Sequence, residues 1–230
     1  MWLILLVVLA IIIYFGVEIV AYNKTTYKEV THNSYFKTRF DTGRLGEYDI
    51  YMYLKSYENE GCKFLFNVYL PKRDGKTTEL DVLMIGKDAV YVFESKNYSG
   101  WIFGTDTQRT WTQVLPKGKG KSQKEKFYNP VWQNKTHCET LKAFLPQGAT
   151  IKSVVLFSNR CTFKDVTVTS KDVAVVHRKD VRRVVEQMSK TATLPLKVEE
   201  VYEKLYPFSQ VSDEVKKSHI EDINSYKQDV

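Results

Sequence analysis

Cysteine is scarce in this chain of 230 residues, occurring at Cys62, Cys138 and Cys161. Such widely spaced cysteines, odd in number, form neither a disulfide framework nor a CxxC metal knuckle. His137 stands beside Cys138 but has no matching second pair of ligands, which excludes a four-ligand zinc site. A reducing compartment is therefore the simpler expectation.

Charge is absent from residues 2–17, and after Glu18 the apolar character resumes as far as Tyr22. A helix of about 20 residues spans about 30 Å, the hydrocarbon thickness of a bilayer, and a buried core helix is rarely apolar on every face. A cleaved signal peptide is disfavoured, because no Lys or Arg precedes the apolar run and Glu18 and Tyr22 flank Ala21 where small residues would be needed. We expect residues 1–22 to be an uncleaved transmembrane anchor.

Basic residues are missing before this segment but frequent after it, at Lys24, Lys28, Lys37 and Arg39. The positive-inside rule then predicts the N-terminus outside and the remaining residues in the cytoplasm. Over the whole chain 34 Lys and Arg exceed 27 Asp and Glu, giving a net charge of +7. This surplus favours anionic partners such as nucleic acid or anionic lipid, and it also fits a basic surface that serves only solubility.

The residues after the anchor predict a mixed α/β domain. Residues 23–40 are polar and lack a clear period, which is typical of a linker. Beyond them, apolar spacing, capping residues and runs of β-branched and aromatic residues delimit helices and strands. We expect helices at 45–57, 129–145, 181–188 and 198–205, and strands at 63–70, 79–85, 89–95, 100–104, around Trp111, and at 153–157 and 173–176. The order of helix, three strands, helix and strand indicates a mixed α/β core.

Two neighbouring strands of this core carry charged residues among apolar ones. Asp81 lies in the strand 79–85, and Glu94 and Lys96 end the next strand on one face, because side chains alternate along a strand. Hard carboxylate oxygens suit Mg²⁺ or Mn²⁺, and such an ion can polarise a phosphodiester. Lys96 could then orient the attacking water or offset developing charge. The spacing alone also fits solvated carboxylates with Lys96 as their ion-pair partner.

An ordered set of motifs surrounds these strands over about residues 40 to 157. It comprises Gly46-Glu47, Asn67-Val68, Glu79-Leu80-Asp81-Val82-Leu83, Phe93-Glu94-Ser95-Lys96, Gly100-Trp101-Ile102-Phe103-Gly104, Trp111 and Asn129-Pro130-Val131-Trp132-Gln133. In order and spacing the set resembles the nuclease-related domain (NERD) family, which is linked to the PD-(D/E)XK nuclease superfamily. Each motif is common by itself, so the specificity lies in the ordered set.

The resemblance implies a restriction-endonuclease-like α-β-β-β-α-β core and a role for each matching residue. Asp81 and Glu94 would be metal ligands, Lys96 the catalytic lysine, and Glu47 an additional acidic group bound to the metal directly or through water. Gln133 resembles the helical glutamine of RecB-type relatives, in which Gln-x-x-x-Tyr is usual. This chain departs from that pattern with His137, which we expect to be an ordinary, partly exposed histidine on the helix face of Gln133.

A run of lysines precedes that helix and predicts a flexible basic loop. Such a loop could bind phosphates as a positive, adaptable flap, since each neutralised phosphate adds salt-sensitive affinity. It could equally be a solvated surface loop, and the sequence leaves both interpretations open. The candidate nucleic-acid-binding residues are Lys117, Lys119, Lys121, Lys124 and Lys126.

The function expected from these features is a membrane-anchored, Mg²⁺-dependent nuclease that hydrolyses DNA phosphodiester bonds, with Mn²⁺ as a second candidate ion. Its partners would be DNA and, through residues 2–22, the lipid bilayer. A catalytically inactive nucleic-acid-binding or scaffold module is the main alternative, and a protein whose basic flank binds anionic lipid is a third. The expected organisation is an anchor at 1–22, a linker at 23–40, a nuclease-related domain at 41–157, a C-terminal α/β extension at 158–206 and a polar tail at 207–230.

Overall fold

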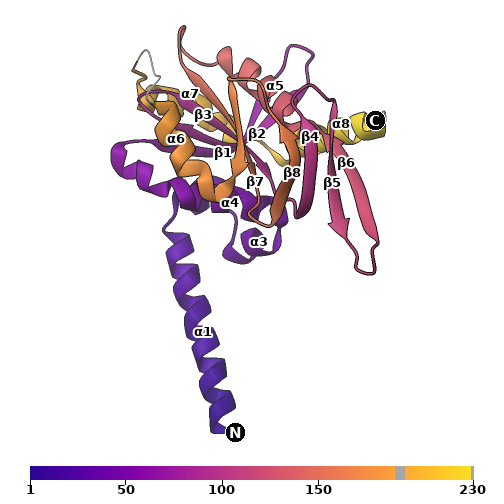
Figure 1. Ribbon diagram of the computed structural model, residues 1–230. Coiled ribbons are helices and arrows are strands. Elements are labelled where there is room, and N and C mark those ends of the chain that lie inside the picture. The colour runs from indigo at the N-terminus through magenta and orange to yellow at the C-terminus, as the bar shows by residue number, and fades with distance from the viewer. Residues whose placement is uncertain (190–194, 229–230) are drawn as a thin grey trace.

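The computed structural model describes residues 1–189 and 195–228, and it has a mixed α/β architecture with two mixed sheets (Figure 1). The helices are α1 (Trp2–Asn23), α2 (Thr26–Thr31), α3 (Tyr35–Phe40), α4 (Thr42–Leu54), α5 (Pro130–Lys142), α6 (Val181–Ser189), α7 (Val198–Leu205) and α8 (Asp213–Gln228). The strands are β1 (Lys63–Pro71), β2 (Thr77–Ile85), β3 (Val90–Lys96), β4 (Gly100–Thr105), β5 (Thr110–Pro116), β6 (Ser122–Tyr128), β7 (Ile151–Phe157), β8 (Cys161–Thr167) and β9 (Val173–His177). The expected mixed α/β architecture is confirmed, and α4, β1, β2, β3, α5 and β7 follow one another in the expected order, with β4, β5 and β6 between β3 and α5.

The first sheet has the strand order β1-β2-β3-β7-β9. Its antiparallel part joins β1, β2 and β3, and its parallel part joins β3, β7 and β9. Strand β3 lies in the middle, and its residues from Val90 to Phe93 are apolar and buried, as is typical of a strand covered on both faces. The parallel register aligns the last residues of three strands, Lys96, Phe157 and His177. The carboxyl ends of β3, β7 and β9 therefore meet at one edge of the sheet.

The second sheet has the order β6-β5-β4-β8, and Trp111 of β5 joins it to the first sheet. The Trp111 side chain is fully buried and stacks on Phe157 of β7, with ring centroids 5.9 Å apart. Gly104 of β4 makes this packing possible, because a Cβ there would lie 2.3 Å from Trp111 Cγ. Strand β8 was not expected, since Lys164 and Asp165 interrupt its apolar residues and both are exposed.

Helices α4 and α5 lie on opposite faces of the first sheet, and this placement creates two separate chemical environments at the end of β3. The Glu94 side chain contacts His137 of α5. The next side chain, Ser95, points to the other face and bonds to Arg178, whose guanidinium lies against Gly46 of α4. Side chains alternate along a strand, so neighbouring residues of β3 serve different sites.

Helix α1 extends away from the rest of the molecule as a single long helix (Figure 1). Its apolar stretch is fully exposed, and its length and composition suit a membrane span and, equally, a signal sequence. Its last turn is different, because Tyr22 is 1% exposed and belongs to the main core. The Tyr22 hydroxyl lies 2.7 Å from Thr38 Oγ1 and donates to the carbonyl of Asn33 at 3.0 Å. The end of the apolar helix is thus built into the folded domain.

Residues 23–40, which we expect to be a linker, contain the two short helices α2 and α3. Thr25 and Ser34 cap these helices by accepting bonds from the backbone N–H of Lys28 and Lys37. Tyr27, Val30 and Tyr35 are buried in the main core. The helices are too short for a detectable period, and their burial depends on aromatic residues that contact distant parts of the chain.

The basic segment before α5 differs from the expected flexible loop, and the polar C-terminal tail contains a helix. The first is a β-hairpin: Lys124 and Lys126 lie on β6, and the turn is closed by a bond from Lys117 N to Lys121 O. The tail contains α8. His219 of this helix is buried against β2, and its Nδ1 lies 3.0 Å from Thr77 Oγ1. Residues 190–194 of the expected extension and 229–230 of the expected tail lie outside the described residues.

Candidate active site

Helix α5 brings two polar side chains against the end of β3. Asn129 begins the helix by accepting a bond from Val131 N at 2.9 Å, and Pro130 occupies its first turn, as expected from Asn129-Pro130. Gln133 and His137 are four residues apart and therefore share one helix face. Both contact residues of β3 on the face opposite α4.

Glu94, Lys96 and Gln133 form a continuous chain of contacts. Lys96 Nζ lies 2.7 Å from Glu94 Oε1 and donates to Gln133 Oε1 at 2.9 Å. The Glu94 side chain is 2% exposed and that of Lys96 is 16% exposed, so this ion pair is largely shielded from water. Burial alone would raise the pKa of Glu94, but Lys96 and His137 reverse the shift and lower it. For Lys96, burial is outweighed by the charges of Glu94 and Asp81, which raise its pKa.

Asp81 lies beside this chain of contacts on the neighbouring strand. The register pairs Val82 with Phe93, so Asp81 and Glu94 follow as the next positions on adjacent strands. Asp81 Oδ2 accepts a bond from Ser95 N at 2.7 Å. Burial and the charges of Glu94 and Glu47 raise the pKa of Asp81 well above its ordinary value. The structure thus brings Asp81, Glu94 and Lys96 to one place at the end of the sheet.

Glu47 lies on α4, close enough to Asp81 for its charge to act on that carboxyl. It is buried, and Tyr27 donates to its Oε2 at 3.3 Å. Burial and the nearby charge of Glu79 raise the pKa of Glu47 to about 7, against the lowering effect of a bond from Asn67. Glu47 influences Asp81 through charge, and in the described contacts its oxygens are bonded to Tyr27 and Asn67. Asn67 of β1 has a φ of 49°, a left-handed backbone conformation that interrupts the pairing of β1 with β2 at this point.

The donor set fits a divalent cation that retains waters, although it is not a complete protein cage. Within residues 1–189 and 195–228, no group of three or more His, Cys, Asp or Glu side chains is arranged to hold a metal ion. Lys96 and His137 occupy the two oxygens of Glu94. Mg²⁺ usually binds through one or two carboxylates and completes its shell with waters and substrate phosphates. Burial first, and then the charges of Glu94 and Glu47, raise the pKa of Asp81, and a cation beside these carboxylates would favour the ionised form of Asp81.

His137 contradicts its expected role as an ordinary, partly exposed helix residue. It is 5% exposed, with Nε2 lying 3.0 Å from Glu94 Oε2 and Nδ1 lying 2.7 Å from Thr78 Oγ1. The residue therefore fixes the Glu94 carboxylate from the side opposite Lys96. The four-residue spacing from Gln133 places His137 on the correct helix face. The burial of the His137 side chain, however, depends on how closely α5 packs on the sheet.

The five candidate lysines lie apart from these side chains, on the β5–β6 hairpin, and all are exposed. The hairpin nevertheless joins the site through its other face. Phe127 packs against Tyr98 with ring centroids 4.4 Å apart, and Tyr98 follows Lys96 by two residues. Phe127 and Tyr98 thus connect the hairpin to the end of β3, while none of the described contacts joins a lysine of the hairpin to Asp81 or Glu94.

Comparison with known proteins identifies the family that this fold and these side chains belong to. The model of the nuclease-related domain matches residues 42–158, just over half of the 230 residues. The chain therefore belongs to the nuclease-related domain (NERD) family. It is also similar to an uncharacterized protein of Bacillus anthracis, with 27% identity over 178 residues, which is 77% of this chain and 82% of that protein. No solved structure matches.

Proposed function

We propose that this protein is a membrane-anchored nuclease that hydrolyses DNA phosphodiester bonds with Mg²⁺, or with Mn²⁺ in its place. The observation that carries the proposal is that Lys96 contacts both Glu94 and Gln133 in a largely buried position, with Asp81 next to them. The element order α4-β1-β2-β3-α5-β7 is consistent with a restriction-endonuclease-like core, and membership of a nuclease-related family points to nucleic acid. A buried ion pair contributes little net stability, so stability alone is a weak reason for this arrangement.

Asp81 and Glu94 would hold the ion, with Glu47 binding it directly or through water. When bound, the ion would polarise the phosphate and acidify a coordinated water. Lys96 supplies the positive charge that offsets the charge developing on the phosphate oxygens, and Gln133 directs the Lys96 ammonium by accepting its bond. His137 holds the second oxygen of Glu94 and so fixes the plane of that carboxylate.

The experiment that tests the activity is incubation of the full-length chain, purified in a neutral detergent, with supercoiled plasmid. Nicked or linear DNA is expected with Mg²⁺ and intact plasmid with EDTA. A parallel digestion of single-stranded DNA and RNA defines the substrate. If the protein binds DNA and cuts none of these substrates with Mg²⁺ or Mn²⁺, the inactive binding module becomes the better description.

We predict that the hairpin lysines act on binding and leave the chemical step unchanged. Replacing Lys124 and Lys126 by Gln should weaken DNA binding and reduce the salt dependence, by about 0.9 in the log–log slope for each phosphate that is no longer neutralised. The measurement is fluorescence anisotropy with a labelled duplex in EDTA at several salt concentrations. The matched control replaces Lys204 and Lys217, two exposed lysines on α7 and α8, by Gln. An equally large decrease of affinity in the control would assign the effect to net charge alone.

We also propose that α1 stays attached and spans the membrane, with the domain in the cytoplasm. Tyr22 supports this proposal, because it lies at the end of α1 and its side chain belongs to the main core. Cleavage close to Ala21 would either separate Tyr22 from the rest of α1 or remove Tyr22 from the core. The protein is expected to remain in the membrane fraction after a carbonate wash, and a reporter fused to its C-terminus should be active in the cytoplasm. A soluble form lacking about 22 residues would show instead that α1 is a signal sequence.

A further inference from the structure

A second polar site lies on the other face of β3, in a cavity of about 520 Å³. Three of its lining residues, Asn97, Ser158 and Arg178, directly follow the aligned carboxyl ends of β3, β7 and β9. Ligands of open α/β sheets bind in the crevice outside the carboxyl ends of parallel strands. The cavity is also large enough for a small ligand of nucleotide size.

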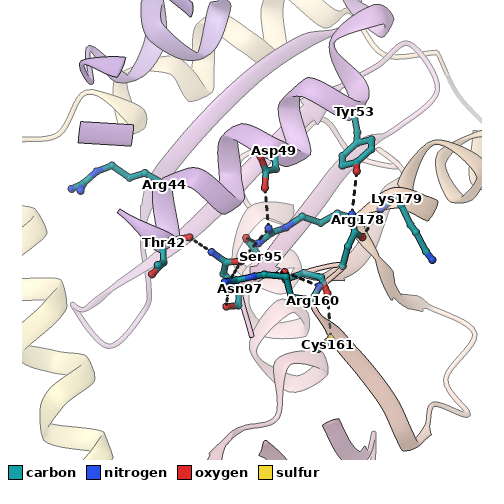
Figure 2. A network of polar contacts seen from close by, with 12 residues as sticks. Thr42, Arg44, Asp49, Tyr53, Ser95, Asn97, Arg160, Cys161, Arg178 and Lys179 are labelled. Carbon is teal, nitrogen blue, oxygen red and sulfur yellow. Dashed lines mark hydrogen bonds and ion pairs between the residues drawn. The ribbon is translucent and has the colours of Figure 1, made fainter. Parts of the chain in front are cut away.

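Arg178 is the central group of this cavity, and it is unusual in being 3% exposed. Its Nη1 donates to Asp49 Oδ2 and Asn97 Oδ1, both at 3.2 Å, and its Nη2 donates to Ser95 Oγ at 3.2 Å (Figure 2). Its Nε is buried without a partner. Gly46 of α4 makes room for the guanidinium, because a Cβ there would lie 2.5 Å from Nη2. A buried arginine with an unsatisfied N–H costs free energy, which suggests a role in binding.

Arg160 brings a second guanidinium to the same acceptor. Its Nη2 donates to Asn97 Oδ1 at 3.1 Å, and its Nε donates to Ser158 Oγ at 3.2 Å. Asp49 is paired with Arg178, so Arg160 leaves the lining with a surplus of positive charge. Burial and, to a smaller extent, the charge of Arg160 lower the pKa of Arg178, whereas the charge of Asp49 raises it. An anion between the two guanidinium groups would relieve their repulsion.

An aromatic side chain completes the cavity on the α4 side. Tyr53 is 38% exposed, and its hydroxyl accepts a bond from Asn159 Nδ2 at 3.1 Å, which holds the ring at the rim. An exposed ring next to arginines can take a nucleobase by stacking, and every base offers a face for this contact. Arg44 and Lys179 are near the lining residues Thr42 and Arg178 in the sequence, but their side chains point away from the polar contacts around Arg178 (Figure 2).

We propose that this cavity binds one nucleoside monophosphate unit of a nucleic-acid strand, with the phosphate at Arg160 and Arg178 and the base against Tyr53. The proposal rests on the proposed nuclease function, because Asn97 directly follows Lys96 and the two sites flank the end of β3. A strand that reaches the Glu94 region would place a neighbouring nucleotide in the cavity. The Arg178 cavity thus acts as a nucleotide-binding subsite that contributes no group to the cleavage step.

The test is isothermal titration of the full-length chain in neutral detergent and EDTA, where no cleavage can occur. The probes are AMP, adenosine, inorganic phosphate, and a short oligonucleotide with and without a 5′-phosphate. AMP is expected to bind more tightly than adenosine or phosphate. Arg160→Gln should weaken AMP binding by about tenfold or more, and Tyr53→Ala by at least about fivefold. Both residues are exposed, so both variants should fold.

Lys179→Gln is the matched control, because it removes one positive charge beside Arg178 from a side chain that points away. Gly46→Ala is a second probe, since the added methyl group displaces the Arg178 guanidinium and should weaken AMP binding while suiting the helix. Equal AMP binding in the wild type and every variant, or no AMP binding by the wild type, overturns the proposal. Phosphate binding as tight as that of AMP, with no effect of Tyr53→Ala, overturns the nucleotide assignment.

Asp81→Asn separates this inference from the proposed activity. The variant should bind AMP as the wild type does, because Asp81 lies outside the cavity lining. Loss of AMP binding with intact cleavage would reject the subsite alone. AMP binding without cleavage by the wild type would reject the nuclease and retain the nucleotide site. Tighter binding of the 5′-phosphorylated oligonucleotide than of its unphosphorylated form would identify a strand end as the occupant.

Discussion

Replacing Asp81 by Asn, or Glu94 by Gln, is expected to lower Mg²⁺-dependent DNA cleavage by at least about 1,000-fold. Both substitutions keep the shape of the side chain and remove the anionic oxygen that would hold the ion. The measurement is the rate of plasmid nicking at saturating Mg²⁺. Glu79→Gln is the matched control. It also removes a carboxylate from β2, but the Glu79 carboxylate accepts a bond from the Tyr69 hydroxyl and is not one of the proposed metal ligands. Equal decreases in all three variants would contradict the assignment.

The same Asp81 variant should gain stability while its activity falls. Burial and the neighbouring carboxylates raise the pKa of Asp81, so the ionised form destabilises the folded state above the ordinary pKa of an aspartate. At neutral pH in EDTA, Asp81→Asn should therefore raise the midpoint of thermal unfolding or leave it unchanged. A lowered midpoint would mean that Asp81 serves the fold, and the decrease in cleavage would then carry no information about metal binding.

Replacing Lys96 by Met should lower cleavage by about 100- to 1,000-fold and leave metal binding intact. Methionine keeps the apolar stem of the side chain, whereas the ammonium that contacts Glu94 and Gln133 is removed. Mn²⁺ affinity, measured by titration, should be equal or higher, because Lys96 competes with a cation for Glu94 Oε1. Cleavage is best measured in single-turnover reactions, which separate the chemical step from product release.

The Lys96 prediction has two controls. Lys96→Arg keeps a positive charge and should retain more activity than Lys96→Met, although the guanidinium is not an equivalent of the ammonium. Thermal unfolding of each variant shows whether the unpaired Glu94 destabilises the fold, as removal of one partner of a buried pair commonly does. Wild-type cleavage by folded Lys96→Met would exclude Lys96 from the chemistry.

The strands that carry the candidate site could be predicted from sequence because their signals are local. Asp81 stands in an apolar strand, and the alternation of side chains places Glu94 and Lys96 on one face. The cap at Asn129 and the proline after it likewise set the start of α5 and hence the position of Gln133. These inferences needed only neighbours along the chain.

The remaining features depend on contacts between distant segments. Arg178 lies more than 80 residues from Ser95 and Asn97, and nothing near it in the sequence indicates that it is buried at the end of three aligned strands. His137 reaches Glu94 only because α5 packs closely on the sheet. The lysines of β6 favoured a loop by composition, although pairing with β5 makes the segment a strand. In each case tertiary packing overrides the local pattern.

The burial of Tyr22 limits the distance between the proposed active site and the membrane. A flexible linker over residues 23–40 would let the domain move up to about 60 Å from the bilayer. The contacts of Tyr22 with Thr38 and Tyr35 remove that freedom, since the last turn of α1 is part of the core. In the membrane-anchored nuclease that we propose, the domain stays within a thin layer beneath the membrane. Its encounters are then set by lateral diffusion, and DNA becomes a target when it enters that layer.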